Sequence, residues 1–457
     1  MRQGVRLEPL LQAISDFLDD QQDIIERVRR DLVRGLRKPS SGRRGLTPQQ
    51  VLRSFVLKRV KNWDYRELCE RITDGMTLRQ FTDFNCEPVP RHHAFHRDFN
   101  RLRPDTLRAI NDLVVSAAVD LGLEDGCKLR VDTTVVETDI HHPTDNTLLW
   151  DVVRVITRSV GHLAKAMKRR RIKGFCNHTR AARRRMQQIQ RMTTRQRQEG
   201  QTRAYRSLIG IAEEVVRNAH WVLQSTGKAG GKDMFASLAV ASIREEIAHY
   251  CGLGTRVINQ ARRRILDGEH VPNAEKIYSI FEPHTDLIKR GKVRTPLEFG
   301  HKVFLAESAQ GLITQYAVLK GNPSDEMHVA PSLRRHRKAF GRAPQLYGAD
   351  RGFFSEQNVS SCARSGVSVV CIPQRGGKKA PAREAYERSA PFREGQRFRA
   401  GIEGRISVLS RGRGMKRCLA EGSQRFELWV GAAVLANNLL VIAALLTKRS
   451  RRRRTSG

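Results

Sequence analysis

The chain has 457 residues and 39 % of them are hydrophobic, which is enough for two or three domains with buried cores and excludes a wholly disordered chain. Its formal net charge of +36 means that its positive side chains repel one another unless a polyanion neutralises them. Nucleic acid is therefore the first candidate partner and an anionic membrane surface the second. The many arginines favour phosphate groups, because one guanidinium group can donate two parallel hydrogen bonds.

The sequence also indicates a compartment. It begins without the apolar stretch of a signal peptide. Its longest apolar segment, residues 426–446, contains Glu427, Asn437 and Asn438, and such polar residues favour a buried core helix over a membrane span. The 8 cysteines include no Cys-x-x-Cys pair, which is typical of reduced thiols. We therefore expect a cytoplasmic protein with no membrane partner.

We expect residues 1–125 to be helical. Apolar residues recur at helical spacing from Leu7 to Leu36. Thr47 followed by Pro48 is typical of a helix N-terminus, with Thr as the N-cap and Pro in the first turn. Short arginine-rich helices around a tight turn fit a helix-turn-helix reader of DNA, and equally an ordinary helical bundle. Residues 38–45 are rich in Pro, Ser and Gly and predict a linker.

The segment Lys128–Glu137 predicts a β-strand, because it is rich in β-branched residues and follows Gly126. It carries Asp132 in its middle. A carboxylate in a buried strand loses its hydration and needs a cation or a metal ion, whereas one on an edge strand faces water. This strand alone leaves both possibilities open.

Residues 151–270 predict a basic helical insertion. The segment Lys165–Arg206 is dense in Arg and Lys and contains one acid, Glu199. We favour a surface that contacts the DNA backbone over a face that is merely solvated. The candidate DNA-binding residues in this segment are Arg169, Arg170, Arg171, Arg183, Arg184 and Arg185.

Beyond residue 271 the hydrophobic period becomes that of strands. The predicted elements are strands at 303–306, 312–319, 345–350 and 367–372, helices at 355–364 and 393–415, and a basic loop at 374–388. Gln310-Gly311 predicts the turn of a hairpin between the first two of these strands. Strands that alternate with helices in this way indicate an α/β fold with a mixed sheet.

Three acids stand out against this pattern: Asp132 within a strand, Asp350 at the end of another, and Glu403 on a late helix. They converge if the two strands are neighbours and the helix packs across them. Carboxylate oxygens are the ligands that Mg²⁺ and Mn²⁺ prefer. Two such ions can activate a hydroxyl group and stabilise the leaving oxygen of a phosphodiester.

Three stretches carry a resemblance to a known family. They are Arg130-Val-Asp-Thr-Thr-Val-Val-Glu, Tyr347-Gly-Ala-Asp-Arg-Gly-Phe and Arg399-Ala-Gly-Ile-Glu-Gly-Arg-Ile-Ser. In combination they make residues 45–445 resemble the DDE transposases of bacterial insertion sequences, closest to the broad IS4/IS5-like group and its unclassified relatives.

The resemblance implies a catalytic triad of Asp132, Asp350 and Glu403 on a ribonuclease-H-like core, where the triad holds Mg²⁺ or Mn²⁺ and two ions are expected. It implies nicking at transposon ends and then attack of the freed 3′-hydroxyl on target DNA. The implied partners are the terminal inverted repeats and the target DNA, bound by a homodimer or a larger assembly on the nucleoid.

The chain departs from the IS4-type signature at two positions around the last acid. Gln396 stands where that signature has Tyr, and Ser410 stands where it has Lys, with Lys416 or Arg413 as alternatives for the Lys. The helical insertion also follows the first strand, which is not where the better-known relatives carry theirs. The subgroup therefore stays open.

Several nearby acids compete with the triad. The rivals are Glu394 and Glu421 for the third acid, and Asp139 and Asp145 for the first. Glu403 lies between Arg399 and Arg405, so it also fits a surface ion pair. Asp325 is a further candidate to lie near the site and shape it.

Basic residues near the acids have two possible roles. Arg351, Lys302 and Arg399 are candidates to hold DNA phosphates close to the metal ions. They fit equally well as ion-pair partners of the acids.

The resulting prediction is an α/β protein with a ribonuclease-H-like mixed-sheet core, a helical N-terminal domain and a large helical insertion. The predicted parts are a DNA-binding domain at 1–125, the first part of the core at 126–150, the insertion at 151–270, the rest of the core at 271–446 and a basic tail at 447–457. Two alternatives to a transposase remain: an inactive DNA-binding descendant of one, and a structure-selective nuclease on the same core.

Overall fold

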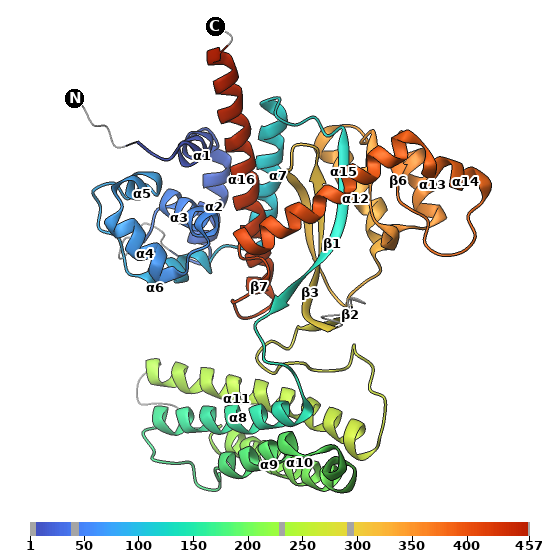
Figure 1. The fold of residues 1–457 in the computed structure, drawn as a ribbon. Helices are drawn as coiled ribbons and strands as arrows, with labels where there is room; N and C mark the ends of the chain where they lie inside the picture. Colours follow the sequence, from blue (N-terminus) through green and yellow to red (C-terminus); the bar gives the residue numbers. More distant parts are fainter. Residues whose placement is uncertain (1–5, 38–44, 228–233, 290–296, 456–457) are drawn as a thin grey trace. The chain divides into compact units, whose positions relative to one another are not determined.

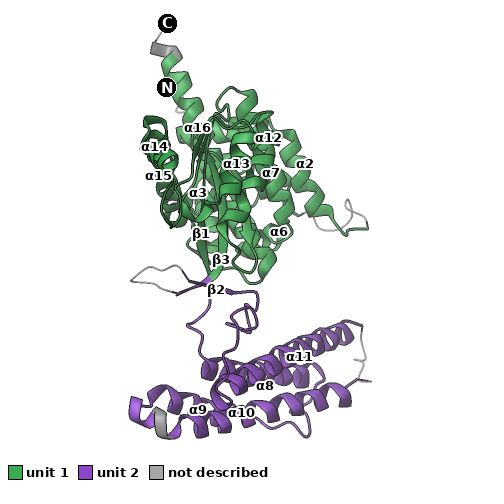
Figure 2. Ribbon diagram, turned by 90° about the vertical axis from the view of Figure 1, so that its right-hand side faces the viewer, with its two compact units in different colours: residues 1–138, 300–457 green, residues 139–299 purple. Residues whose placement is uncertain are grey.

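The computed structural model describes residues 6–37, 45–227, 234–289 and 297–455. It forms two compact units, of which unit 1 comprises residues 1–138 and 300–457 and unit 2 comprises residues 139–299 (Figure 2). The predicted linker at 38–45 lies outside the described residues except for its last position. The N-terminal helices and the last helix thus share one unit with most of the sheet, and the sequence-based domain boundaries stay predictions.

The N-terminal part of unit 1 is helical. Its elements are α1 (Pro9–Asp19), α2 (Gln22–Val33), α3 (Pro48–Lys61), α4 (Tyr65–Asp74), α5 (Met76–Phe81), α6 (His92–Phe99) and α7 (Pro104–Asp120). The apolar run from Leu7 to Leu36 divides into α1 and α2 at Gln21, whose backbone is not helical (φ −107°, ψ 65°). Helix α3 begins where predicted, because the Thr47 hydroxyl accepts a hydrogen bond from the backbone N–H of Gln50 at 3.1 Å.

The sheet is mixed, as predicted (Figure 1). Its strands are β1 (Lys128–Thr138), β2 (Asp286–Lys289), β3 (Leu297–Ser308), β4 (Ile313–Leu319), β5 (Leu346–Gly348), β6 (Val369–Cys371) and β7 (Arg417–Cys418). The order is β2-β3-β1-β5-β6, with β4 on β3 and β7 on β1. Strand β1 is antiparallel to β3 and parallel to β5. The mixed α/β class is therefore confirmed, whereas the ribonuclease-H-like core stays a prediction.

The helices that follow β4 differ from the predictions in two places. They are α12 (Val329–Phe340), α13 (Glu356–Arg364), α14 (Pro381–Arg388), α15 (Ala390–Ser407) and α16 (Ser423–Thr455). The predicted loop at 374–388 contains α14, which pairs of opposite charge four residues apart stabilise, Arg383 with Glu387 and Arg388 with Glu384. Helix α15 ends at Ser407 and passes into a π-helical turn, so the prediction of a helix to residue 415 was too long.

Helix α16 contains the apolar segment 426–446 and is a core helix of unit 1. Within the described residues, Ser423–Arg452 is long and apolar enough to cross a membrane by length and composition, and 67 % of its apolar window is buried in the protein. Its two buried asparagines have partners there: Asn438 donates to the backbone oxygen of Ile313 and to the side chain of Asn111, both at 2.8 Å. Such satisfied polar groups fit a protein core.

Unit 2 is a helical bundle with its own apolar core. Its helices are α8 (Asp145–Ala166), α9 (Thr179–Arg191), α10 (Thr194–Ser225) and α11 (Met234–Ala261), followed by a π-helical turn at Arg262–Leu266. Leu149, Val153 and Ile156 of α8 are buried in that core. The apolar residues follow the helical period, which is why this basic segment folds and does not remain a solvated coil.

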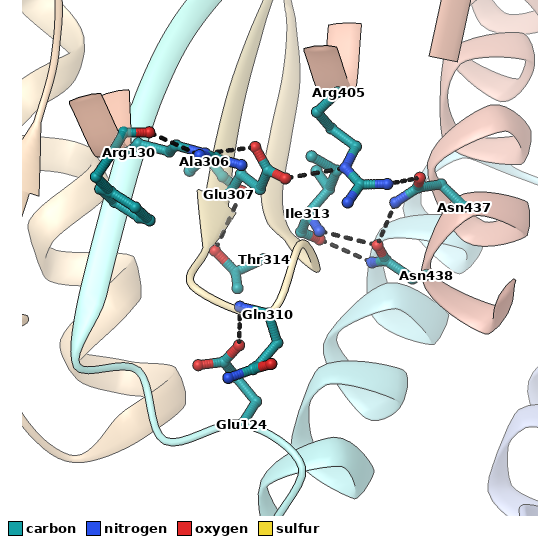
Figure 3. A network of polar contacts seen from close by, with 11 residues as sticks. Glu124, Arg130, Ala306, Glu307, Gln310, Ile313, Thr314, Arg405, Asn437 and Asn438 are labelled. Carbon is teal, nitrogen blue, oxygen red and sulfur yellow. Dashed lines mark hydrogen bonds and ion pairs between the residues drawn. The ribbon is translucent and has the colours of Figure 1, made fainter. Parts of the chain in front are cut away.

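A buried carboxylate that contacts two guanidinium groups connects helix α15 to the sheet (Figure 3). Glu307, near the end of β3, has no exposed surface. Its carboxylate accepts hydrogen bonds from Nε of Arg130 on β1 at 2.7 Å and from Nε of Arg405 on α15 at 2.9 Å. Arg130 also donates to the backbone oxygen of Phe398 at 2.6 Å. Both cations therefore position α15 across β1.

The same network reaches α16 and the predicted hairpin turn. Arg405 donates to Oδ1 of Asn437 at 3.0 Å, and Asn437 donates to Oδ1 of Asn438 at 3.1 Å (Figure 3). Gly311 has φ +90° in the turn between β3 and β4, and a Cβ there would collide with Arg405. Glycine at this turn thus serves both the left-handed backbone and the approach of the guanidinium group.

We expect Glu307→Gln to lower the free energy of unfolding by about 3–5 kcal/mol, because it leaves two largely buried guanidinium groups without their carboxylate. Denaturant unfolding followed by circular dichroism measures the loss. The matched control is Glu137→Gln, which removes a partly exposed pair with Arg417 and should cost about 0–1 kcal/mol. Equal small losses in both variants would show that Glu307 is not what holds α15.

We also expect acid to destabilise unit 1 through His336, whose pKa burial lowers from 6.5 to about 4. Its Nε2 lies 3.0 Å from the backbone oxygen of Gly126 and, among the described residues, its buried Nδ1 has no hydrogen-bond partner. Between these two pH values the unfolded chain binds more protons at this position, so stability falls as pH drops through the window, by about 3 kcal/mol. His336→Gln should flatten that slope in denaturant unfolding between pH 7 and about 4; an unchanged slope would refute this assignment.

Candidate active site

Strands β1 and β5 place two of the predicted acids. Asp132 lies in the middle of β1, opposite Leu305 of β3, and is 9 % exposed. Asp350 follows β5 by two residues and caps a 3₁₀ turn, where its Oδ1 accepts a hydrogen bond from the backbone N–H of Gly352 at 2.8 Å. Strands β1 and β5 are parallel neighbours in which Arg130 pairs with Gly348, so Asp132 and Asp350, each two residues further on, come to the same level.

Helix α15 brings the third acid to these two through Arg399. The Nη2 atom of Arg399 lies 3.0 Å from Oδ2 of Asp132 and 3.9 Å from Oδ2 of Asp350. Its Nη1 atom lies 3.3 Å from Oε1 of Glu403, one turn further along the helix. All three predicted acids therefore contact one guanidinium group. Their side chains are 12 %, 39 % and 69 % exposed, so the site opens to solvent on the side of Glu403.

The surroundings of Asp132 shift its protonation. Burial raises its pKa to about 6, Arg399 opposes that rise, and the carboxylates of Asp350 and Asp325 add to it. The backbone N–H of Thr133 donates to its Oδ1 at 2.7 Å and favours the charged form. A buried acid with two acidic neighbours and one cationic neighbour has an excess of negative charge, and such an arrangement favours the binding of a further cation.

Asp325 is a fourth carboxylate in this neighbourhood. Its Oδ1 accepts hydrogen bonds from the hydroxyl of Thr133 at 3.0 Å and from Nζ of Lys302 at 3.3 Å. A Cβ at Gly352 would lie 2.9 Å from Oδ2 of Asp325 and 3.1 Å from Oδ1 of Asp350, so both carboxylates flank that glycine. The sequence made Asp325 a candidate neighbour of the site and gave no reason for these contacts.

The carboxylate oxygens of these acids are suitable ligands for a divalent cation, but the acids are not grouped closely enough to share one ion. Asp132 and Asp350 each bring a carboxylate oxygen to Nη2 of Arg399, at 3.0 and 3.9 Å, and carboxylate oxygens are the ligands that Mg²⁺ prefers. Within the described parts of the chain, however, no three His, Cys, Asp or Glu side chains are grouped closely enough to hold one ion. The prediction that Asp132, Asp350 and Glu403 bind metal together therefore stays a prediction.

Most of the rival acids have partners elsewhere. Asp145 is buried in unit 2. Its carboxylate accepts hydrogen bonds from Nη1 of Arg264 at 2.6 Å and from Nε2 of Gln260 at 3.1 Å. Asp139 also belongs to unit 2. Glu394 pairs with Lys128 at 3.3 Å, away from Arg399, and Glu421 lies on an exposed loop before α16.

Two residues considered for the IS4-type signature have partners other than the three acids. Gln396 donates to Sγ of Cys371 on β6 at 3.0 Å. Arg413 donates to the backbone oxygen of Val60 at 2.8 Å, which ties it to helix α3. Gln396 and Arg413 thus have structural partners of their own.

The basic residues proposed for DNA differ in their surroundings. Lys302 contacts Asp325 and the backbone oxygen of Pro323, and Arg399 contacts the three acids, so both are ion-pair partners in this structure. Arg351 is exposed beside Asp350. In unit 2, the candidate arginines are all exposed: Arg169, Arg170, Arg171, Arg183, Arg184 and Arg185. Contact of any of these with DNA stays a prediction.

Comparison with known proteins bears on the N-terminal part of the chain. Residues 3–101 match the model of a transposase domain (DUF772). No curated protein and no solved structure gives a significant match. The matched segment spans α1 to α6 and contains none of the three acids on Arg399, so it bears on the family and not on the site. The similarity of this segment to a transposase domain supports a transposase family for the chain.

Proposed function

We propose that the protein is a transposase that binds transposon ends and uses Asp132, Asp350 and Glu403 to cut DNA and join it to a target. The observation that carries this proposal is the contact of all three acids with the guanidinium group of Arg399. Asp132 lies more than two hundred residues before the other two acids, and the three come from different elements. The similarity of residues 3–101 to a transposase domain supports the same function independently.

Arg399 holds the three carboxylates together and offsets their mutual repulsion. In the proposed reaction Asp132, Asp350 and Glu403 would hold Mg²⁺ or Mn²⁺, and Arg399 would contact a DNA phosphate. Such ions activate a hydroxyl group and stabilise the leaving oxygen of a phosphodiester. Asp132 is the least exposed of the three acids and burial raises its pKa, so a cation close by would stabilise its charged form.

The charge of the chain supports DNA as the substrate. A net charge of +36 gives a strong, salt-dependent attraction to a polyanion. In the proposed complex the exposed arginines of unit 2 and Arg351 contact the DNA backbone, while a homodimer or larger assembly on the nucleoid holds two transposon ends. Phosphate contacts of this kind give affinity and orientation without reading the sequence.

We expect Asp132→Asn, Asp350→Asn and Glu403→Gln each to reduce strand cleavage by about 100-fold or more, because each removes a negative oxygen from the proposed site. The assay measures Mg²⁺-dependent nicking and strand transfer on a plasmid that carries the DNA flanking the coding region. Binding to the same DNA, measured by gel shift, should change less than about threefold.

The control for this experiment is Glu394→Gln, which removes an acid from the same helix without touching Arg399. Full cleavage by any of the three acid variants would remove that acid from the proposed site. Cleavage without any joined product would favour the nuclease alternative, and binding without cleavage in the unmodified protein would favour an inactive descendant.

We further expect Arg399→Gln to lower the free energy of unfolding at pH 7.5 by about 2–3 kcal/mol, because it leaves Asp132 partly buried without its counter-charge. Addition of millimolar Mg²⁺ should then raise the melting temperature more in this variant than in the unmodified protein. Arg397→Gln, at an exposed position of α15, is the control and should show neither effect. An equal response to Mg²⁺ in all three proteins would argue against cation binding at these acids.

A further inference from the structure

A second site in unit 1 lies between the matched transposase segment and the end of the chain. It is a pocket of about 670 Å³ formed by α3, α4 and α6 on one side and by the loop around β7 and the start of α16 on the other. It contains none of the acids that contact Arg399. Its volume falls in the range of about 300–1,000 Å³ that is usual for sites that bind small molecules.

Two buried cations line this pocket. Lys58 and Arg59 are only 7 % and 6 % exposed, and neither forms an ion pair within the described residues. Burial and the neighbouring Arg59 lower the pKa of Lys58 to about 7, and burial lowers the pKa of Arg59 to about 10. Burying two adjacent positive charges without an anion is unfavourable for the fold alone, which points to an anion supplied from outside.

The acids of the pocket offset this charge only in part. Asp64 is the carboxylate that affects Lys58, but its Oδ1 caps α4 by accepting hydrogen bonds from the backbone N–H groups of Arg66 and Glu67 at 2.7 and 2.8 Å. Glu421 is exposed on the rim. The rim adds Lys416 and Arg425, together with Arg417, which pairs with Glu137.

The walls of the pocket are aromatic. The guanidinium group of Arg59 lies 3.6 Å from the centre of the Trp429 ring, and Nζ of Lys58 lies 4.6 Å from the centre of the Tyr65 ring. Nε1 of Trp429 donates to the backbone oxygen of Gly414 at 2.8 Å, which fixes the indole. Trp63 also lines the pocket. Aromatic rings beside unpaired cations are the combination that binds a base and its phosphate.

We propose that this pocket binds an unpaired nucleotide of a DNA strand, with its phosphate on Lys58 and Arg59 and its base stacked on the aromatic side chains. The pocket would thereby hold a strand in which pairing has been lost, separately from the acids that are proposed to cut it. Binding here does not depend on cleavage, so this inference and the proposed function can fail independently.

The test is a fluorescence titration of the full-length protein without divalent cations. Two of the 4 tryptophans, Trp63 and Trp429, line the pocket, so a bound base should quench their emission. The probe is a 5′-phosphorylated single-stranded tetranucleotide, compared with its unphosphorylated form, with dAMP and with inorganic phosphate. We expect saturable quenching by the phosphorylated strand and about tenfold weaker binding without the phosphate, because a charge-assisted contact is lost.

Variants separate the pocket from general attraction to DNA. Lys58→Met should weaken binding of the tetranucleotide about tenfold, whereas Lys61→Met, a more exposed cation on the same helix, should change it less than about twofold. Lys58→Met should also melt no lower than the unmodified protein, because an unpaired buried charge is removed. Arg425→Gln, at the exposed rim, provides a second variant that leaves the core intact and should weaken binding in the same direction.

Three results would overturn the proposal. The first is the absence of saturable quenching, and the second is equal weakening by Lys58→Met and Lys61→Met. The third is binding of inorganic phosphate or dAMP as tight as that of the tetranucleotide, which would assign the pocket to a free anion or a free nucleotide. A lower melting temperature for Lys58→Met, with unchanged binding in both Lys58→Met and Arg425→Gln, would make the cations structural and also refute it.

Discussion

Glu307 is wholly buried between Arg130 and Arg405, and the position of helix α15 depends on that pair of contacts. Charges this deep are unfavourable singly and stable only when all partners are present. Because one arginine comes from β1 and the other from α15, the network sets how the helix crosses the strand. Arg399 and Glu403 lie on the same helix as Arg405, so their distance from Asp132 on β1 follows from the same anchor.

Unit 1 contains two charged sites that are built in opposite ways. At Arg399 one cation is shared by three carboxylates, and at the α3 pocket two cations are buried without an ion pair among the described residues. The first arrangement has an excess of negative charge and suits a cation. The second has an excess of positive charge and suits a phosphate group. In each site the most buried charges, Asp132 in the first and Lys58 and Arg59 in the second, attract a counter-charge more strongly than they would at the surface.

Local signals in the sequence predicted much of the fold. Thr47 caps α3 and Ser355 caps α13, because a hydroxyl before an apolar helical period satisfies free backbone N–H groups. The run of β-branched residues around Asp132 is β1. Signals that depend on side-chain pairs were missed: α14 looked like a basic loop, and its ion pairs became apparent only once Arg383 and Glu387 faced each other.

The sequence by itself determined the charge of the chain, the mixed α/β class, the core role of the last long helix and the identity of three acids worth testing. Only the tertiary structure decided that these acids share Arg399, that Asp325 flanks Asp350 across Gly352, and that Lys58 and Arg59 are buried against Trp429. The physical reason is that periodicity and capping act over a few residues and are written in the sequence. Convergence of charges from distant segments depends on strand order and on how helices pack across the sheet, and neither is encoded locally.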